Sequence, residues 1–249
     1  MNTILGIDIG GTGIKGAIVD VDTGLLVTKK HRIDTPQPAT PDAVTATVKQ
    51  IVSHFDWKGP VGCGFPAAIQ QGVIRTAANI SSDWLNVNAE ELFSAQIGLP
   101  FKMLNDADAA GMAEMRCGAG KGVEGVVMMV TLGTGIGSAL FSNGHLQPNT
   151  ELGHLELHGM KVEHYASNAV RKKQDLDWKE WSSRLNEVLN VYSSLFWPDL
   201  FIIGGGVSKK HAHFFPLLES IVPIVAAQRK NKAGMIGAAI YSFEHFNRM

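Results

Sequence analysis

The chain has 249 residues, of which 45% are hydrophobic and 18% charged, a composition typical of a globular protein with one large or two smaller domains. No apolar run of about 18 residues predicts a membrane span and no secretory signal pattern opens the chain, so we expect a cytoplasmic protein. The formal net charge of −1 argues against nucleic-acid or membrane partners, and two cysteines, Cys63 and Cys117, exclude a disulfide framework and a thiolate zinc site.

The first predicted elements form an antiparallel meander around a glycine-rich turn. Apolar residues predict strands over residues 4–9 and 14–21, on either side of the glycines. The sequence Asp22-Thr23-Gly24 predicts a second turn. Residues 25–33 alternate and predict a third strand.

The glycine-rich phrase occurs twice. Gly11-Thr12-Gly13-Ile14 matches Gly133-Thr134-Gly135-Ile136, with an apolar run before and after each copy. Glycines let a backbone turn sharply and approach an anion closely, and successive N–H groups in such a turn bind phosphate oxygens. Thr12 and Thr134 each add a hydroxyl donor. We therefore expect one phosphate-binding hairpin in each half of the protein.

The first glycines also invite comparison with two known nucleotide-binding motifs. Gly11, Gly13 and Gly16 fit the dinucleotide fingerprint G-x-G-x-x-G, and Asp34 stands about where a ribose-binding acid would. That fingerprint must open a helix, whereas residues 17–24 are typical of a strand and a turn. A P-loop is excluded because no Gly-Lys-Ser/Thr follows. Two unrelated glycine-rich hairpins remain the structural alternative.

The middle of the chain alternates helices and strands. Helical spacing covers residues 41–55, and residues 85–98 predict a helix with Asn88 as N-cap and Glu91 completing a capping box. The remaining segments here are two strands that run into loops and a helix rich in small residues, namely 59–69, 100–106 and 107–120.

The second half repeats the strand, turn and strand pattern. Residues 125–131 and 138–142 predict strands around the second glycine turn, and Asn143-Gly144 predicts a tight hairpin turn. The later segments predict an aromatic-rich core helix, then a buried strand with a glycine loop and a helix, and finally a helix with a small-residue face, over residues 177–197, 199–211 and 233–246. This order favours an α/β protein with two halves.

Asn105 and Asp106 are the leading catalytic candidates, because they stand where a strand ends and a helix begins. Ligands of open α/β sheets bind at the carboxyl ends of strands. A carboxylate there can accept a proton from a hydroxyl while a phosphoryl group is transferred to it. Asp108 competes for this role, although an acid in the first helical turn is also explained by the helix dipole.

Polar residues after the second hairpin suit a polyhydroxylated ligand. Glu151, His154 and Glu156 lie close together in the sequence and can bond sugar hydroxyls. A metal cluster of His154, His158, Glu163 and His164 is the alternative, with loose spacing and no thiolate.

Four basic clusters punctuate the chain, and we interpret each as a solvated face. They are residues 29–32, 171–173, 209–211 and 229–232.

Six ordered motifs resemble those of the ROK family of sugar kinases, and are most similar to its members that use polyphosphate. They are GIDIGGTGIKGAIVD, GFPAAI, LNDADAAGMAE, TLGTGIGSALF, NTELGHLEL and LFIIGGGVSK, and the resemblance covers residues 4–241. It implies a two-domain actin/hexokinase-like, ribonuclease H-like α/β fold with a central cleft. The expected domains are residues 1–106 with the C-terminal helix 234–249, and residues 107–233.

The resemblance also implies a site. Asp106 is the implied general base on the glucose 6-hydroxyl. The implied sugar-binding residues are Asn105, Glu151, His154 and Glu163, with Asn79 and the loop Gly64 to Ala67 less directly involved. The implied donor-phosphate residues are Asp8, Gly10, Gly11, Thr12, Lys15, Thr134, Gly135, Gly205 and Gly206, with Asp8 also facing Mg²⁺ indirectly.

Two departures from family patterns narrow the function. Many relatives carry a cysteine-rich zinc motif after the Gly-His pair, but residues 155–165 hold no cysteine, so we expect no zinc. ROK repressors carry an N-terminal helix-turn-helix, for which a strand beginning at Ile4 leaves no room. We therefore expect a kinase and no transcription factor.

The donor and the assembly stay open. Inorganic polyphosphate needs a basic track, for which Lys209-Lys210 and Arg229 to Lys232 are candidates, whereas ATP needs an adenine slot between residues 204–210 and the last helix. A kinase using ATP alone, or a non-catalytic sugar sensor, are the alternatives. The helix over residues 178–197 is a candidate homodimer face.

Overall fold

The computed structural model describes residues 2–78 and 80–247 and divides the chain into two compact units. Unit 1 comprises Met1–Ala113 and Lys232–Met249, and unit 2 comprises Glu114–Asn231. The chain passes between the units twice, once within the helix Asp106–Cys117 and once within the 3₁₀ helix Lys230–Lys232. No helix in the described part of the chain is long and apolar enough to cross a membrane.

Unit 1 contains a six-stranded mixed sheet in the order β3-β2-β1-β5-β8, with β4 also paired to β2. Its strands are β1 (Thr3–Gly10), β2 (Gly13–Asp20), β3 (Leu25–Leu26), β4 (His31–Ile33), β5 (Val61–Phe65) and β8 (Phe101–Asn105). Its other elements are α1 (Pro41–His54), β6 (Ile69–Gln70), β7 (Val73–Ile74), the 3₁₀ helix η1 (Ser82–Trp84), α2 (Ala89–Ile97), most of α3 (Asp106–Cys117) and α7 (Ala233–Phe246).

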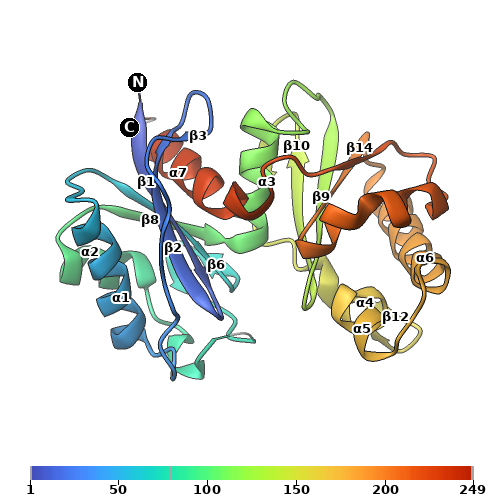
Figure 1. The fold of residues 1–249 in the computed structure, drawn as a ribbon, viewed down its shortest axis with the longest axis horizontal. Coiled ribbons are helices and arrows are strands. Elements are labelled where there is room, and N and C mark those ends of the chain that lie inside the picture. Colours follow the sequence, from blue (N-terminus) through green and yellow to red (C-terminus); the bar gives the residue numbers. More distant parts are fainter. Residues whose placement is uncertain (1, 79, 248–249) are drawn as a thin grey trace. The chain divides into compact units, whose positions relative to one another are not determined.

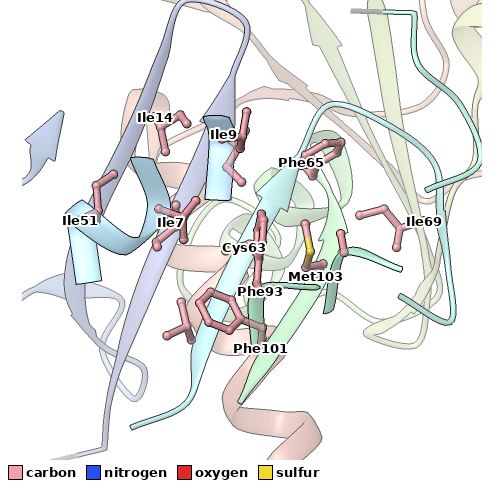
Figure 2. Close-up of a cluster of buried hydrophobic side chains, with 14 of the residues drawn as sticks. Ile7, Ile9, Ile14, Ile51, Cys63, Phe65, Ile69, Phe93, Phe101 and Met103 are labelled. Atoms are coloured by element: carbon pink, nitrogen blue, oxygen red, sulfur yellow. The ribbon is translucent and has the colours of Figure 1, made fainter. Parts of the chain in front are cut away.

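Successive side chains along β1 and β5 point to opposite faces of this sheet. Odd residues of β1 and β5, such as Ile7 and Cys63, enter the hydrophobic core with Ile51 of α1 and Phe93 of α2 (Figure 2). Even residues face α7, which lies across the other side of the sheet (Figure 1). This follows from the two-residue period of a strand, and it buries β5 on both faces.

Glycines let α7 lie against the strands. A Cβ at Gly62 would stand 1.9 Å from the carbonyl oxygen of Ala238, and one at Gly237 would stand 1.6 Å from that of Ala109 in α3. Only a residue without a side chain permits these backbone approaches. The small-residue face of the last helix therefore joins the C-terminal end of the chain to the N-terminal sheet.

Unit 2 contains a five-stranded sheet in the order β11-β10-β9-β14-β15. Its strands are β9 (Val126–Leu132), β10 (Ile136–Ser142), β11 (His145–Gln147), β14 (Leu200–Gly204) and β15 (Ile224–Ala226), with a separate pair β12 (Glu156–Leu157) and β13 (Met160–Lys161). The helices are η2 (Leu152–His154), α4 (Val162–Ala166), α5 (Asn168–Lys173), α6 (Trp178–Phe196), η3 (Gly206–His213), η4 (Phe215–Leu217) and η5 (Lys230–Lys232, which ends in unit 1).

The long helix α6 supplies the core of unit 2. Trp181, Leu185 and Tyr192 are fully buried and pack in one cluster with β9 and β14. Asp177 and Glu180 close a capping box at the helix start. The core interpretation of this aromatic helix is confirmed, while Leu195 and Trp197 near its end stay 56% and 76% exposed.

The two sheets share one strand plan, which explains the repeated phrase. In each, an antiparallel hairpin is followed by two parallel strands: β2-β1-β5-β8 in unit 1 and β10-β9-β14-β15 in unit 2. Gly10 pairs with Gly13 in the first hairpin, which leaves a two-residue turn. Leu132 pairs with Ile136 in the second, which leaves three residues in the turn. The two hairpins therefore differ by one residue in turn length, with Gly10 standing where the second copy has Leu132.

Of three predictions made from the sequence, two differ from the structure and one is confirmed. The dinucleotide alternative is wrong, because β2 and no helix follows the first glycines. The single strand predicted over residues 25–33 is two short strands, since the Thr28 hydroxyl accepts the Ile18 N–H at 3.0 Å and so takes the place of a backbone carbonyl. The Asn88 N-cap of α2 is confirmed, with its side chain accepting from the Glu91 N–H at 3.2 Å.

A third difference concerns the segment after the triple glycine. A helix was predicted there, and the structure has the 3₁₀ helix η3 with a non-helical Lys210 inside it. Its start is fixed by Gly205, whose φ of +79° is favourable only for glycine.

Candidate functional site

The first glycine hairpin joins β1 to β2 and exposes Gly11 and Thr12 at its tip. Two positions before the glycines, Asp8 faces Lys15 across the ladder, and the carboxylate Oδ2 lies 3.0 Å from the Lys15 Nζ. A Cβ at Gly234 would stand 2.8 Å from the Asp8 carboxyl carbon, which places that carboxylate against the first turn of α7.

Asn105 and Asp106 divide two tasks at the junction of β8 and α3. The Asn105 side chain is buried, and its Oδ1 accepts the N–H groups of Ala107 at 2.8 Å and Asp108 at 3.3 Å, which makes it the cap of α3. Its amide donates to the Ala67 carbonyl at 3.2 Å and so holds the predicted loop Gly64 to Ala67. Asp106 is exposed at the first helical position.

The choice between the two acids of this helix follows from burial. Asp108 is only 1% exposed, whereas Asp106 is exposed at the N-terminal end of α3. A general base must come within hydrogen-bond reach of its substrate. The exposed carboxylate of Asp106 is accessible to a ligand, whereas the buried carboxylate of Asp108 is not.

In unit 2 the second glycine hairpin lies against a predicted sugar-binding residue. A Cβ at Gly135 would stand 2.4 Å from the Glu163 Oε2, so the carboxylate rests on the bare backbone of the hairpin. Glu163 Oε1 lies 3.5 Å from His154 Nε2. Burial raises the pKa of Tyr192, and the nearby negative charge of Glu163 adds to that rise. Gly135, His154 and Glu163 thus form one cluster.

The turn that carries Glu151 and His154 is fastened to β10. The buried Ser138 hydroxyl donates to the Thr150 carbonyl and accepts the Leu152 N–H at 3.1 Å. A Cβ at Gly153 would stand 1.9 Å from the Ile136 carbonyl oxygen. Sequence reasoning missed Ser138 and the reason for Gly153, because both roles depend on contact with another segment.

The triple-glycine loop is brought beside the second hairpin. A Cβ at Gly205 would stand 2.4 Å from the carbonyl oxygen of Leu132, the residue that precedes that hairpin. Gly206 begins η3, and Lys209 is exposed within it. The predicted donor residues of unit 2, which are Thr134, Gly135, Gly205 and Gly206, therefore lie in two neighbouring loops.

The alternative of a four-residue metal cluster is wrong. His158 Nε2 lies 2.6 Å from Glu187 Oε2, whereas His154 and His164 lie beside Glu163. Among residues 2–78 and 80–247, no three His, Cys, Asp or Glu side chains gather as a metal site. The prediction for Asn79 falls outside the described residues.

Arg32 belongs to the basic cluster 29–32, which was predicted to be a solvated face. Its guanidinium donates to the Thr12 carbonyl at 2.7 Å and lies against Gly13, where a Cβ would stand 2.5 Å from Nε. The sequence shows only a cluster of basic residues at this position. It does not indicate that β4 pairs with β2 and so places Arg32 beside the first hairpin.

The shared strand plan, with an antiparallel hairpin and two parallel strands in each sheet, defines a protein of two related α/β units. The chain belongs to the ROK family, whose model matches residues 4–169.

Close relatives make the comparison more specific. The chain is 48% identical over 238 residues to a polyphosphate glucokinase of Mycobacterium tuberculosis (strain CDC 1551 / Oshkosh), covering 95% of this chain and 90% of that one. It is similar in structure to the inorganic polyphosphate/ATP-glucomannokinase of Arthrobacter sp. strain KM, with a TM-score of 0.92, 46% identity, and coverage of 98% and 100%. A ROK family glucokinase from Streptomyces griseus shares the fold with a TM-score of 0.83 at 24% identity, with coverage of 98% and 100%. The predicted fold class and family are confirmed.

Proposed function

We propose that this chain is a glucokinase that transfers the terminal phosphoryl group of inorganic polyphosphate to the 6-hydroxyl of glucose, giving glucose 6-phosphate. The observation that carries the proposal is the exposed Asp106 at the start of α3, beside the buried Asn105 that caps this helix. The relatives named above, a polyphosphate glucokinase and a polyphosphate/ATP-glucomannokinase, support the acceptor and the donor.

In the proposed reaction the side chains of this chain position the substrates and move one proton. Asp106 accepts the proton of the glucose 6-hydroxyl as the hydroxyl oxygen attacks the terminal phosphorus. The bond from that phosphorus to the bridging oxygen breaks, and the polyphosphate leaves one phosphate shorter. Glu151, His154 and Glu163 bond the sugar hydroxyls from unit 2, with Asn105 from unit 1. Glu163 suits this task because it is held on Gly135, so little side-chain freedom is lost when the sugar binds.

The donor side of the proposal uses both hairpins. Backbone N–H groups of Gly11 and Thr12, and of Thr134 and Gly135, neutralise phosphate charge together with Lys15 and the loop at Gly205-Gly206. Each glycine permits close approach of the backbone to the phosphate.

Mg²⁺ is part of the proposal, and the donor set fits it. Mg²⁺ binds through one or two carboxylates, waters and substrate phosphates instead of a full protein cage. The Asp8 carboxylate is a hard oxygen ligand, and the described residues hold no three-ligand cluster that would compete for the ion. Asp8 would hold the ion indirectly, and the ion when bound would supply charge neutralisation at the donor phosphates.

The first experiment measures glucose 6-phosphate made by the purified protein with Mg²⁺, comparing long-chain polyphosphate with ATP as the sole donor. Product from polyphosphate is expected. Product from ATP alone would replace the proposal with an ATP-dependent hexose kinase. No product from either donor, with a glucose-dependent rise in Tm, would replace it with a sugar sensor.

Polyphosphate binding is expected to weaken steeply as salt rises, because a polyanion releases counterions when cations of the protein bind it. Lys209 and Lys210 are exposed on η3, directly after the donor loop at Gly205-Gly206. Replacing both by Ala should reduce the slope of log KM for polyphosphate against log salt. The double change of Lys172 and Lys173 to Ala removes two exposed charges from α5 of the same unit and is the control. An equal slope in both variants would refute the track at η3.

A homodimer is also proposed, through the exposed end of α6. Leu195 and Trp197 are large apolar side chains that this unit leaves uncovered. Sedimentation of the wild type and of Trp197→Ser tests this proposal, and a wild-type monomer at assay concentration would refute it.

A further inference from the structure

One short segment, residues 32–37, donates hydrogen bonds to the backbone carbonyl oxygens of the first glycine hairpin. Arg32 donates to the Thr12 carbonyl at 2.7 Å, the Thr35 hydroxyl donates to the Gly10 carbonyl, and the Gln37 amide lies 3.5 Å from the Gly11 carbonyl. Three consecutive carbonyl oxygens are thus held by three donors from residues 32–37. We call Arg32, Thr35 and Gln37 the carbonyl clamp.

The clamp fixes where the hairpin N–H groups point. In a trans peptide the N–H and the C=O point in opposite directions. When the carbonyls of Gly10, Gly11 and Thr12 face the clamp, the N–H groups of the following three residues face away from it. An anion is repelled by carbonyl oxygens and attracted by N–H groups, so this arrangement makes one side of the turn suitable for phosphate.

The hairpin needs such a device because of its composition. Glycine populates positive and negative φ about equally, so a peptide unit that adjoins a glycine rotates at little cost. Rotation of the Gly10–Gly11 unit, which Thr35 holds, or of the Thr12–Gly13 unit, which Arg32 holds, would present a carbonyl where a phosphate-binding N–H is required. The clamp selects one orientation before the donor arrives, which lowers the cost of binding.

The two strongest members of the clamp have different surroundings. Thr35 is buried at 7% exposure, so its hydroxyl bond is shielded from water. Arg32 is 46% exposed and pairs with Asp34, which is 84% exposed. That ion pair is weak in water, so the contact with Thr12 and the packing on Gly13 give Arg32 its place.

We infer that Arg32 and Thr35 are positioning residues for the phosphate donor, acting through the orientation of the first glycine hairpin. The inference rests on the proposed function for the identity of the donor, but it predicts phosphate binding whether or not transfer occurs. Loss of either residue weakens the hold on donor phosphates and leaves glucose binding unchanged, because the clamp donates to the donor hairpin and to none of the proposed sugar-binding residues.

The test measures the Kd of sodium tripolyphosphate by calorimetry with Mg²⁺, beside glucose 6-phosphate formation. Arg32→Ala and Thr35→Val should each raise the Kd and the donor KM by about ten-fold, the change that follows when about 1.4 kcal/mol of preference for the binding orientation of the hairpin is lost. The KM for glucose should hold, whereas the Tm of Thr35→Val should fall because that variant removes a shielded hydrogen bond. Thr35→Ser keeps the hydroxyl and should restore binding, and Arg32→Lys should restore it in part.

Lys58 offers a matched control. Its ion pair with Asp56 is on the surface of the same unit, with exposures of 79% and 86%, so Lys58→Ala removes one exposed cation without touching the hairpin. Equal Kd values for Arg32→Ala and Lys58→Ala would overturn the inference, as would a wild type that does not bind tripolyphosphate. A wild type that binds tripolyphosphate but forms no glucose 6-phosphate would overturn the proposed function and leave the clamp supported by its variants.

Discussion

Asp106→Asn is expected to lower kcat for glucose 6-phosphate formation by about 100-fold or more, the scale of a lost general base. The amide has nearly the same shape as the carboxylate but cannot accept the proton of the glucose hydroxyl. Asn105 continues to cap α3 in the variant, since its bonds go to backbone N–H groups. Glucose affinity, measured by calorimetry, should therefore remain within a few-fold of the wild type.

The control for this variant is Asp42→Asn. Asp42 is another exposed carboxylate in the first turn of a helix, α1, and its replacement removes the same favourable interaction with a helix dipole. It should leave kcat unchanged. If Asp106→Asn turns over at the wild-type rate, or if the two variants lose the same activity, Asp106 is not the base.

Gly153→Ala is expected to lower kcat/KM for glucose by about 100-fold, with a rise in KM, because a misplacement of about 1 Å at a positioning residue has an effect of that size. The new Cβ would meet the Ile136 carbonyl oxygen at 1.9 Å, a backbone atom that cannot move without distorting β10. The turn that carries Glu151 and His154 must shift instead. Initial rates at saturating donor give the KM.

Gly159→Ala separates displacement of the site from loss of stability. Gly159 has a φ of +74° in the turn between β12 and β13, and a Cβ there meets no atom within 4 Å. The left-handed conformation costs an L-residue about 1–2 kcal/mol, so the Tm should fall, as it should in Gly153→Ala. The KM for glucose should rise only in Gly153→Ala, and a parallel rise in both would attribute the effect to stability.

The Glu163 carboxylate contacts both the second glycine hairpin and the turn that carries His154. It rests on the glycine hairpin predicted to bind the donor, and it faces His154 from the turn predicted to bind the sugar. Gly135 thus has a structural reason to be glycine apart from any phosphate. The repeated phrase in the sequence conceals this difference, since Gly13 in the first hairpin makes room for Arg32 instead.

The sequence by itself determined the local elements and the repeat. Alternating apolar residues on either side of Gly10 to Gly13 predict a hairpin because strand formation and tight turns depend on neighbouring residues. The same is true of the strand-to-helix junction at Asn105-Asp106, where a capping side chain and a first-turn acid are adjacent in the chain.

Only the tertiary structure decided which distant segments share a contact. Arg32 had no signal beyond its charge until β4 paired with β2 and brought it to the first hairpin. Gly62 and Gly237 are required to be glycine because α7 packs on backbone atoms from other segments. The Thr28 hydroxyl interrupts a predicted strand because it reaches Ile18. In each case the structure is decided by a steric or hydrogen-bonded contact between residues far apart in the chain. Local propensity depends only on neighbouring residues and does not include such contacts.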